Sequence, residues 1–469
     1  MGLKAISIFG LGVQSKSSNV TAQKRVNMYL EISADADKNT VTAYGTPGLT
    51  RHASIGASPT RGMYALGDYI YVVNLGKLWQ VNNAGVAVEK GTLLTTTGRV
   101  SMADNGSVGD QLMIVDGTYG YIYTVSTGAF AQITDVDFPG ADTVTFNDGY
   151  FIVSKPATGQ FYLSKSYDGT TWDALDFATA ESNPDNVISV VADHGELIVF
   201  GDVSTEFWTN TGGADFPYSR TNGTAMEWGL AAIKTVARFD NSLIWLAKNR
   251  MGEVQVVRLN GYLPQRVSTT DIETILNSYS GISDATGFSY LMNGHPFYQL
   301  NFTSANESWL YDGLSNAWSQ LKSGTGRHRA EMGTNYLGRT VVSDYENGKL
   351  YNLDSDAYTD DGEMIVSELI TKHVFANLER YSISELQVDL ESGVGLAVGQ
   401  GSEPQIMLQV SKDGGHTWGA ERWVSMGKIG EYAKRAKWNR LGQGRDWVFK
   451  LRISDPVKRV VLGAYVTGA

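Results

Sequence analysis

The chain has 469 residues, with 52 glycines, 10 prolines and no cysteine. Its formal net charge of −11 argues against a protein that binds nucleic acid over its whole surface, because affinity for phosphates needs clustered Lys and Arg. The lack of cysteine excludes disulfides and thiolate metal sites, and it fits a reducing compartment such as a bacterial cytosol. No stretch approaches the ~20 apolar residues of a membrane helix, so we expect no membrane insertion.

Residues 1–60 are polar and irregular. They either form an arm that drapes on a neighbouring molecule or supply first strands that complete the domain that follows. The second interpretation is favoured, because RVNMYLE at residues 25–31 has the pattern of a strand. The opening AISIFGLGV is short, is broken by glycine and lacks a clear cleavage site, so we do not expect a signal peptide.

A repeated unit fills residues 61–360. Each copy has two apolar, alternating strands around a turn that contains Gly, Asn or Asp, and the copies recur every ~40–50 residues, which is the spacing of propeller blades. We therefore predict an all-β fold that begins with a β-propeller of about six to seven blades; one or two large sandwiches are the alternative. The copies are residues 63–85, 108–128, 146–169, 194–213, 239–261, 292–313 and 336–354.

One segment breaks this pattern. The sequence STTDIETILNSYS near 268–280 predicts a short helical insertion in the propeller, with Ile272, Ile275 and Leu276 on one face. Thr270 or Asp271 is the expected N-terminal cap. The helix is expected to lie on the surface, pinned by those apolar side chains.

The sequence pattern changes in residues 361–469, where the alternating strands are longer and the connections between them are wider. This pattern predicts a separate C-terminal β-sandwich. Its last part is basic. This basic face is interpreted either as a solvated strand face or as a surface that docks on an acidic neighbour or on the DNA backbone. The candidate docking face consists of Lys434, Arg435, Lys437, Arg440 and Arg445.

The letters SKDGGHTW at residues 411–418 fit the Asp-box pattern S-x-D-x-G-x-T-W of sialidase-type propellers. In such a hairpin turn the Asp side chain accepts backbone N–H bonds, the glycine takes a positive φ and the Trp packs under the hairpin. All these roles are structural, and a looser copy, SYDGTTW, occupies residues 166–172. The predicted turn residues are Ser411, Asp413, Gly415, Thr417 and Trp418.

Catalytic signatures are absent from the sequence. A glycosidase needs two facing carboxylates, and nothing isolates a pair among the 49 Asp and Glu. The six histidines are scattered, and no hydrolase, zinc-protease or P-loop motif occurs. We therefore predict no enzyme, no catalytic residue, no cofactor and no metal. The sequence leaves one alternative function open, that of a propeller that binds or cleaves glycans, such as a receptor-binding tail protein.

Several blocks along the chain carry a resemblance to known proteins. They are RVNMYLE (25–31), TPGLTRH (46–52), RGMYALGDYIYVVNLGKLW (61–79), GRVSMADNG (98–106), AESNPDNVISV (180–190), ELIVFGDVSTEFWTNTG (196–212), STTDIETILNSYS (268–280) and GEYAKRAKWNRLGQGRDWVFKLRISDPV (430–457). In this order they resemble one family, the packaged-DNA stabilisation proteins of short-tailed bacteriophages, also called tail accessory or nozzle proteins. The resemblance runs from about residue 20 to the end, and it is weakest at about 107–180. No block is a catalytic signature, but the ordered set is fairly specific.

The resemblance implies a structural role in the virion tail, after assembly in the host cytoplasm. It implies a ring, usually of six copies, below the portal and adaptor proteins, with tail plug, needle or spike proteins beneath it. Such a ring extends the DNA channel, retains packaged DNA and serves as the conduit for DNA ejection. An acidic chain suits a conduit, because it repels phosphates and does not bind the passing double-stranded DNA.

Overall fold

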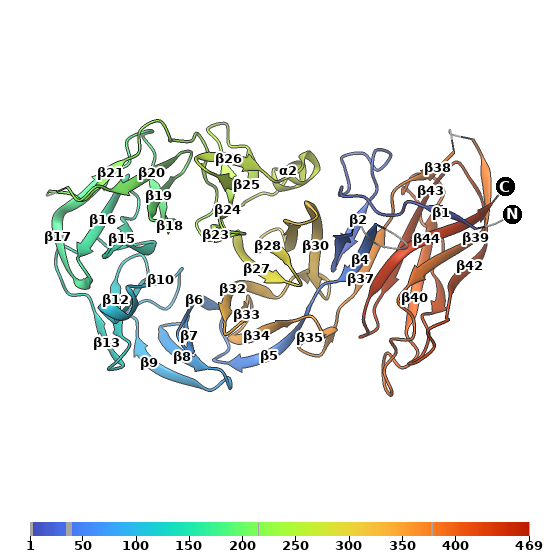
Figure 1. Ribbon diagram of the computed structural model, residues 1–469, viewed down its shortest axis with the longest axis horizontal. Helices are drawn as coiled ribbons and strands as arrows, with labels where there is room; N and C mark the ends of the chain where they lie inside the picture. Colours follow the sequence, from blue (N-terminus) through green and yellow to red (C-terminus); the bar gives the residue numbers. More distant parts are fainter. Residues whose placement is uncertain (1–2, 34–39, 214, 377–378, 469) are drawn as a thin grey trace.

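The computed structural model describes residues 3–33, 40–213, 215–376 and 379–468. Within these residues the chain forms a ring of seven β-sheet blades and, beside it, a two-layered β-sandwich (Figure 1). The prediction of a propeller of about six to seven blades followed by a sandwich is confirmed. Figure 1 also shows both ends of the chain on the sandwich, at the edge of the molecule away from the propeller.

The first four blades are antiparallel sheets of four strands each, in chain order. Blade 1 is β6 (Thr60–Leu66), β7 (Tyr69–Asn74), β8 (Lys77–Asn82) and β9 (Ala87–Thr92); blade 2 is β10 (Ser101–Asp104), β11 (Gln111–Val115), β12 (Gly120–Thr124) and β13 (Ala129–Gln132); blade 3 is β14 (Val144–Asn147), β15 (Tyr150–Ser154), β16 (Gln160–Lys165) and β17 (Asp168–Thr179); blade 4 is β18 (Val187–Asp193), β19 (Glu196–Gly201), β20 (Thr205–Asn210) and β21 (Tyr218–Arg220).

The last three blades vary this plan. The inner strand of blade 5 is split in two, blade 6 continues into the sandwich, and blade 7 takes its outer strand, β5, from the N-terminal region. Blade 5 is β22 (Gly229–Leu230), β23 (Ala237–Arg238), β24 (Leu243–Lys248), β25 (Val254–Asn260) and β26 (Leu263–Arg266); blade 6 is β27 (Thr286–Met292), β28 (His295–Phe302), β29 (Glu307–Asp312) and β30 (Ala317–Ser323), with β31 (Gly326–Arg327) beside β30; blade 7 is β32 (Ala330–Tyr336), β33 (Arg339–Asp344), β34 (Lys349–Asp354) and β5 (Gly48–Ser54), extended by β35 (Thr359–Asp360) and β36 (Glu363–Met364).

Two-residue turns close several of the inner hairpins. Asp148–Gly149, His194–Gly195, Asn293–Gly294 and Leu337–Gly338 each place two consecutive residues at positive φ. This is the signature of the type I′ turn, whose twist matches that of the two strands it joins. Glycine adopts positive φ without strain, so its place in the second position of all four turns favours this turn type. The two-residue turn then fixes which residues of the two strands pair.

The propeller core lies between neighbouring blades rather than in one central mass. Phe200 of blade 4 and Trp245 of blade 5, for example, are fully buried with their ring centroids 5.2 Å apart. The alternating strands have apolar residues on both faces, and each face packs against the next blade. A separate cluster, which includes Trp438 and Trp447, fills the sandwich.

The sandwich consists of two layers, and strands from both ends of the chain take part in each. One layer is β3 (Met28–Ile32), β4 (Val41–Gly45), β44 (Val460–Gly468), β39 (Tyr381–Leu390) and β42 (Ala436–Gly444), with β1 (Lys4–Ile6) paired to β44; the other is β2 (Lys24–Val26), β37 (Ser367–Ile370), β43 (Asp446–Ile453), β40 (Gln405–Ser411) and β41 (Arg422–Ser425), with β38 (Val374–Phe375) paired to β43.

The N-terminal region therefore divides between the two domains. Strand β5 completes blade 7, as we expected of the N-terminal strands. Strands β1, β3 and β4 belong to the sandwich, although we expected from the sequence that they would complete the propeller. Strand β2 lies between β30 of blade 6 and β37 of the sandwich, so that one continuous sheet joins the two domains. Short strands whose partners lie several hundred residues away carry no local sign of the domain they join.

In the described part of the chain two short helices accompany the strands, α1 (Gly106–Gly109) and α2 (Thr270–Leu276). The prediction of a helix near 268–280 agrees with α2, but the predicted cap is wrong. Thr269 is the cap, because its backbone is still extended and its hydroxyl accepts a hydrogen bond from the Ile272 amide. Ile272 and Leu276 are buried against blade 5 and blade 6 residues.

Candidate interaction surfaces

The predicted Asp-box turn joins β40 to β41 in the sandwich. The Asp413 carboxylate accepts bonds from the Thr417 amide at 2.9 Å, the Thr417 hydroxyl at 2.6 Å and the Ser411 hydroxyl at 2.7 Å. The hydrogen bonds from Thr417, then that from Ser411, lower the pKa of Asp413 to about 2. Gly415 has a φ of 94°, and its amide donates to Ser411 Oγ at 2.8 Å.

This turn contacts the N-terminal segment. His416 Nε2 lies 3.0 Å from Asn19 Oδ1 and 3.2 Å from Ser18 Oγ. His373, beside the turn, places Nε2 2.7 Å from the Ser18 carbonyl oxygen, and its Nδ1 lies 2.8 Å from the Asp446 carboxylate. The turn and its neighbours thus hold residues 18–19 against the end of the sandwich.

Trp418 takes a different position from the one expected of an Asp-box tryptophan. It is only half-buried, and the Lys450 ammonium lies 4.2 Å from the centroid of its ring. That distance is within the range of a cation–π contact. Trp418 therefore joins the turn to β43 from the surface.

The looser copy of the motif forms a comparable turn at the start of β17 in blade 3. Asp168 Oδ1 accepts from the Thr170 amide at 2.9 Å, and Asp168 Oδ2 accepts from the Thr171 hydroxyl at 2.7 Å. Trp172 is 4% exposed and donates from Nε1 to the Gly169 carbonyl oxygen at 2.9 Å. Here the tryptophan does fill the core beneath the turn.

The candidate docking face lies along β42, which is an edge strand of its layer. Lys437 is partly neutralised by Glu385 at 3.3 Å. The other four side chains are exposed, and no carboxylate in the described chain pairs with them; they are Lys434, Arg435, Arg440 and Arg445. Arg440 has a φ of 59° at a register shift between β39 and β42, so a local bulge interrupts the strand there.

The charge of the chain is unevenly distributed. Residues 100–227 hold 18 Asp and Glu against 3 Lys and Arg, whereas residues 405–469 hold 5 against 12. We call residues 100–227, which cover blades 2 to 4, the acidic sector. Figure 1 places these blades at the opposite end of the molecule from the sandwich, so the protein carries a charge gradient along its longest axis.

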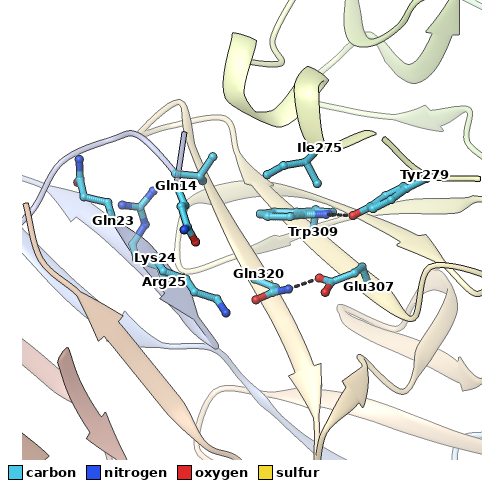
Figure 2. A pocket seen from close by; sticks show the side chains of 10 residues that line it. Gln14, Gln23, Lys24, Arg25, Ile275, Tyr279, Glu307, Trp309 and Gln320 are labelled. Carbon is cyan, nitrogen blue, oxygen red and sulfur yellow. Dashed lines mark hydrogen bonds between the residues drawn. The ribbon is translucent and has the colours of Figure 1, made fainter. Parts of the chain in front are cut away.

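A cavity of about 210 Å³ lies where the N-terminal segment, α2 and blade 6 meet (Figure 2). Trp309 forms one wall and donates from Nε1 to the Tyr279 hydroxyl at 3.0 Å, and Gln320 donates to Glu307. Glu307 is the carboxylate among the lining residues, so the cavity lacks the two facing carboxylates that a glycosidase needs.

The part of the chain that the structure describes holds no group of three or more His, Cys, Asp or Glu side chains arranged to bind a metal ion. It also holds no helix of the length and apolar character needed to cross a bilayer.

A cavity between the inner strands of blades 1 to 5 is lined by a basic side chain that the sequence analysis did not single out. Arg99, in the loop before β10, lies in its wall and donates from Nη1 to the carbonyl oxygen of Ile233, which lies between β22 and β23. An isolated Arg in an irregular segment gives no signal in the sequence, because only the ring closure of the blades brings it opposite Ile233.

The fold defines a two-domain β protein, a β-propeller joined to a β-sandwich. Family models match both domains: the model described as bacteriophage P22 Gp10, β-propeller matches residues 5–358, and the model described as bacteriophage P22 Gp10, β-sandwich matches residues 367–469. The chain belongs to this P22 Gp10 family. It is a structural tail protein of a short-tailed bacteriophage and not an enzyme, which confirms the resemblance noted in the sequence.

The individual proteins that resemble this chain have low sequence identity to it. The tail hub protein gp10 of Salmonella phage P22 is 23% identical over 435 residues, which cover 87% of each chain. Among solved structures, virginiamycin B lyase from Staphylococcus aureus is 9% identical, with a TM-score of 0.45 over 64% of this chain and 95% of that one. YCF48 from Cyanidioschyzon merolae is 13% identical, with a TM-score of 0.44 over 66% and 98%. At these TM-scores neither structural likeness bears on the function of the chain.

Proposed function

We propose that the protein assembles as a ring of six copies below the portal and adaptor proteins of its phage, closes and extends the DNA channel, retains the packaged DNA and serves as the conduit for its ejection. The charge gradient along the molecule carries this proposal. The acidic end suits a surface that faces DNA, and the basic end suits a contact with an acidic partner protein.

The acidic sector suits the lining of the conduit. Carboxylates facing the passing double-stranded DNA repel its phosphates, so the DNA slides without binding. The exposed side chains Asp148, Glu181 and Asp215 belong to this sector. We place the sector toward the ring axis for this reason.

The basic edge of the sandwich suits the contact with an acidic surface of the adaptor. Arg435, Arg440 and Arg445 are exposed and unpaired within the described chain, so they are available for carboxylates of a partner. Charges in such a contact mainly set orientation and the rate of encounter. The tail plug, needle or spike proteins are then the proposed partners on the opposite side of the ring.

The DNA path cannot be the hole of the propeller itself. A cavity of about 300 Å³ lies between the inner strands of blades 1 to 5, and the Arg99 side chain crosses it, with Nη1 2.9 Å from the Ile233 carbonyl oxygen. A duplex has no room there. In the proposed assembly the conduit therefore lies between subunits, around the ring axis.

Light scattering of the purified protein, alone and mixed with the portal–adaptor complex of the same phage, tests the proposal. We expect a ring of six copies to form on the complex. The double variant Arg435→Glu/Arg440→Glu should lose this association, whereas Lys90→Glu, on the outer strand of blade 1, should keep it. Wild-type protein that ignores the complex would contradict the proposed function.

A further inference from the structure

Two long loops pack against each other at one end of the sandwich. Residues 391–404 join β39 to β40, and residues 426–435 join β41 to β42. Because β39 ends beside the start of β44, these loops lie at the end of the sandwich away from the C-terminus. The Gly430 amide donates to the Gly393 carbonyl oxygen at 3.1 Å, so the two loops are tied into one surface.

The close contact between the loops depends on glycine in the first of them. A Cβ atom at Gly395 would lie 3.0 Å from the backbone nitrogen of Ile429, which is tighter than ordinary packing allows. The Leu396 amide donates to the Gly401 carbonyl oxygen at 2.8 Å and closes the turn that carries Val398. The positions of the loop tips are therefore fixed by backbone contacts.

Large apolar side chains project from these fixed tips into solvent. Val398 is 81% exposed, Tyr432 77%, Ile429 63% and Leu396 40%. The cluster that fills the sandwich is made of other residues, so the core of this domain does not explain these four side chains. A group of exposed apolar side chains on an ordered backbone marks a site of interaction. We call these four residues the apolar loop patch.

Unpaired cations border the apolar loop patch. Lys434 and Arg435 follow its last residue closely, and both are exposed and form no ion pair within the described chain. Arg435 belongs to the candidate docking face, which continues along β42, so the apolar patch and the basic face are one continuous surface. The carboxylates of the two loops are already engaged within the chain: Glu391 with Lys458, Glu403 with Lys428, and Glu431 with the Lys428 amide.

We propose that the apolar loop patch anchors the protein on the adaptor, by insertion into an apolar hollow of the adaptor surface that carries carboxylates beside it. This inference rests on the proposed function and assigns the affinity of that contact to the loops. The carboxylates match Lys434 and Arg435 at the edge of the patch. Burial of the apolar side chains holds the complex together, whereas the charges set orientation and the rate of encounter.

Binding kinetics of the full-length protein on the immobilised portal–adaptor complex test the anchor. Val398→Ser/Ile429→Ser should weaken binding about a hundredfold, about tenfold for each side chain, mainly through faster dissociation. The charge variant Arg435→Glu/Arg440→Glu should act mainly by slowing association, with a strong dependence on salt. The matched control is Val136→Ser between blades 2 and 3, since Val136 is 94% exposed at the other end of the molecule and should bind like the wild type.

The outcomes separate the anchor from the proposed function. All these side chains are exposed, so each variant should keep the Tm of the wild type, which verifies that it is folded. Wild-type dissociation by Val398→Ser/Ile429→Ser would overturn the anchor and leave the proposed function standing, whereas a wild type that does not bind the complex would contradict both. Binding of the wild type, but not of Val398→Ser/Ile429→Ser, to vesicles of phosphatidylethanolamine and phosphatidylglycerol would overturn the anchor in favour of a lipid-binding patch.

Discussion

The two Asp-box turns show how one short motif serves two different surroundings. In blade 3 the turn around Asp168 places Trp172 in the core, whereas in the sandwich the turn around Asp413 leaves Trp418 half-buried and contacts the N-terminal segment. The local hydrogen bonds are comparable, with carboxylate oxygens accepting from threonines that follow. The motif therefore determines the turn, and the surrounding strands determine what the turn stabilises.

Replacing Trp172 should have the largest effect. Trp172→Ala removes a fully packed indole from between blades 2 and 3 and should lower the free energy of unfolding by about 3–5 kcal/mol. Urea denaturation followed by circular dichroism measures this loss. A loss below about 1 kcal/mol in the free energy of unfolding would mean that Trp172 contributes no more to stability than Trp418 does.

Trp418→Ala should cost much less, about 1 kcal/mol, because the side chain is half-buried and loses chiefly the Lys450 contact. The matched control is Trp423→Ala, since Trp423 is 50% exposed on the neighbouring strand β41. Equal losses for Trp172→Ala and Trp418→Ala would remove the distinction drawn between the two turns.

Replacing the carboxylates of the two turns should give more similar losses of stability than replacing the two tryptophans. Asp168→Ala and Asp413→Ala should each cost about 1 kcal/mol, because each leaves turn donors without their acceptor in a largely solvated place. Denaturation of both variants beside the corresponding Asn substitutions separates the lost acceptor from the lost charge. A neutral result for Asp413→Ala would show that water replaces the carboxylate there.

The contact with the N-terminal segment should be local. His416→Ala removes the hydrogen bonds to Asn19 and Ser18 and should speed amide exchange in residues 17–22 with less than about 0.5 kcal/mol of global destabilisation. Hydrogen exchange with mass spectrometry detects this. Unchanged exchange in that segment, with faster exchange elsewhere, would contradict the assignment of the contact.

The smallest expected change in the free energy of unfolding is the one that comes from protonation of Asp413 at low pH. Hydrogen bonds lower the pKa of Asp413 to about 2, below the ~3.9 of an unfolded Asp, so the carboxylate stabilises the fold above that range. This contribution is lost as the pH falls through 2. The stability difference between wild type and Asp413→Asn should therefore be full at pH 5 and shrink by pH 2, as measured by urea titration at each pH.

Much of the fold could be predicted because its signals are local. The alternating strands and the turns at Asp148–Gly149 and Asn293–Gly294 revealed the blades, and SKDGGHTW revealed a hairpin. The rest depends on distant partners. Nothing near Lys4–Ile6 predicts pairing with β44, and nothing near Arg99 predicts that Ile233 lies opposite. Sequence patterns describe strands and turns, whereas only ring closure defines the channel.

The position of the first strands has a consequence for synthesis of the chain. β5 pairs with β34 and β2 pairs with β37, so both strands must wait until residues beyond 350 have left the ribosome. The propeller can then close, but β1, β4 and β39 pair with β44 (Val460–Gly468) and must wait longer. Contacts of such long sequence separation form slowly. A nascent chain that lacks β44 leaves the strand edges that pair with it exposed, so the emergence of this last strand commits the sandwich to its fold.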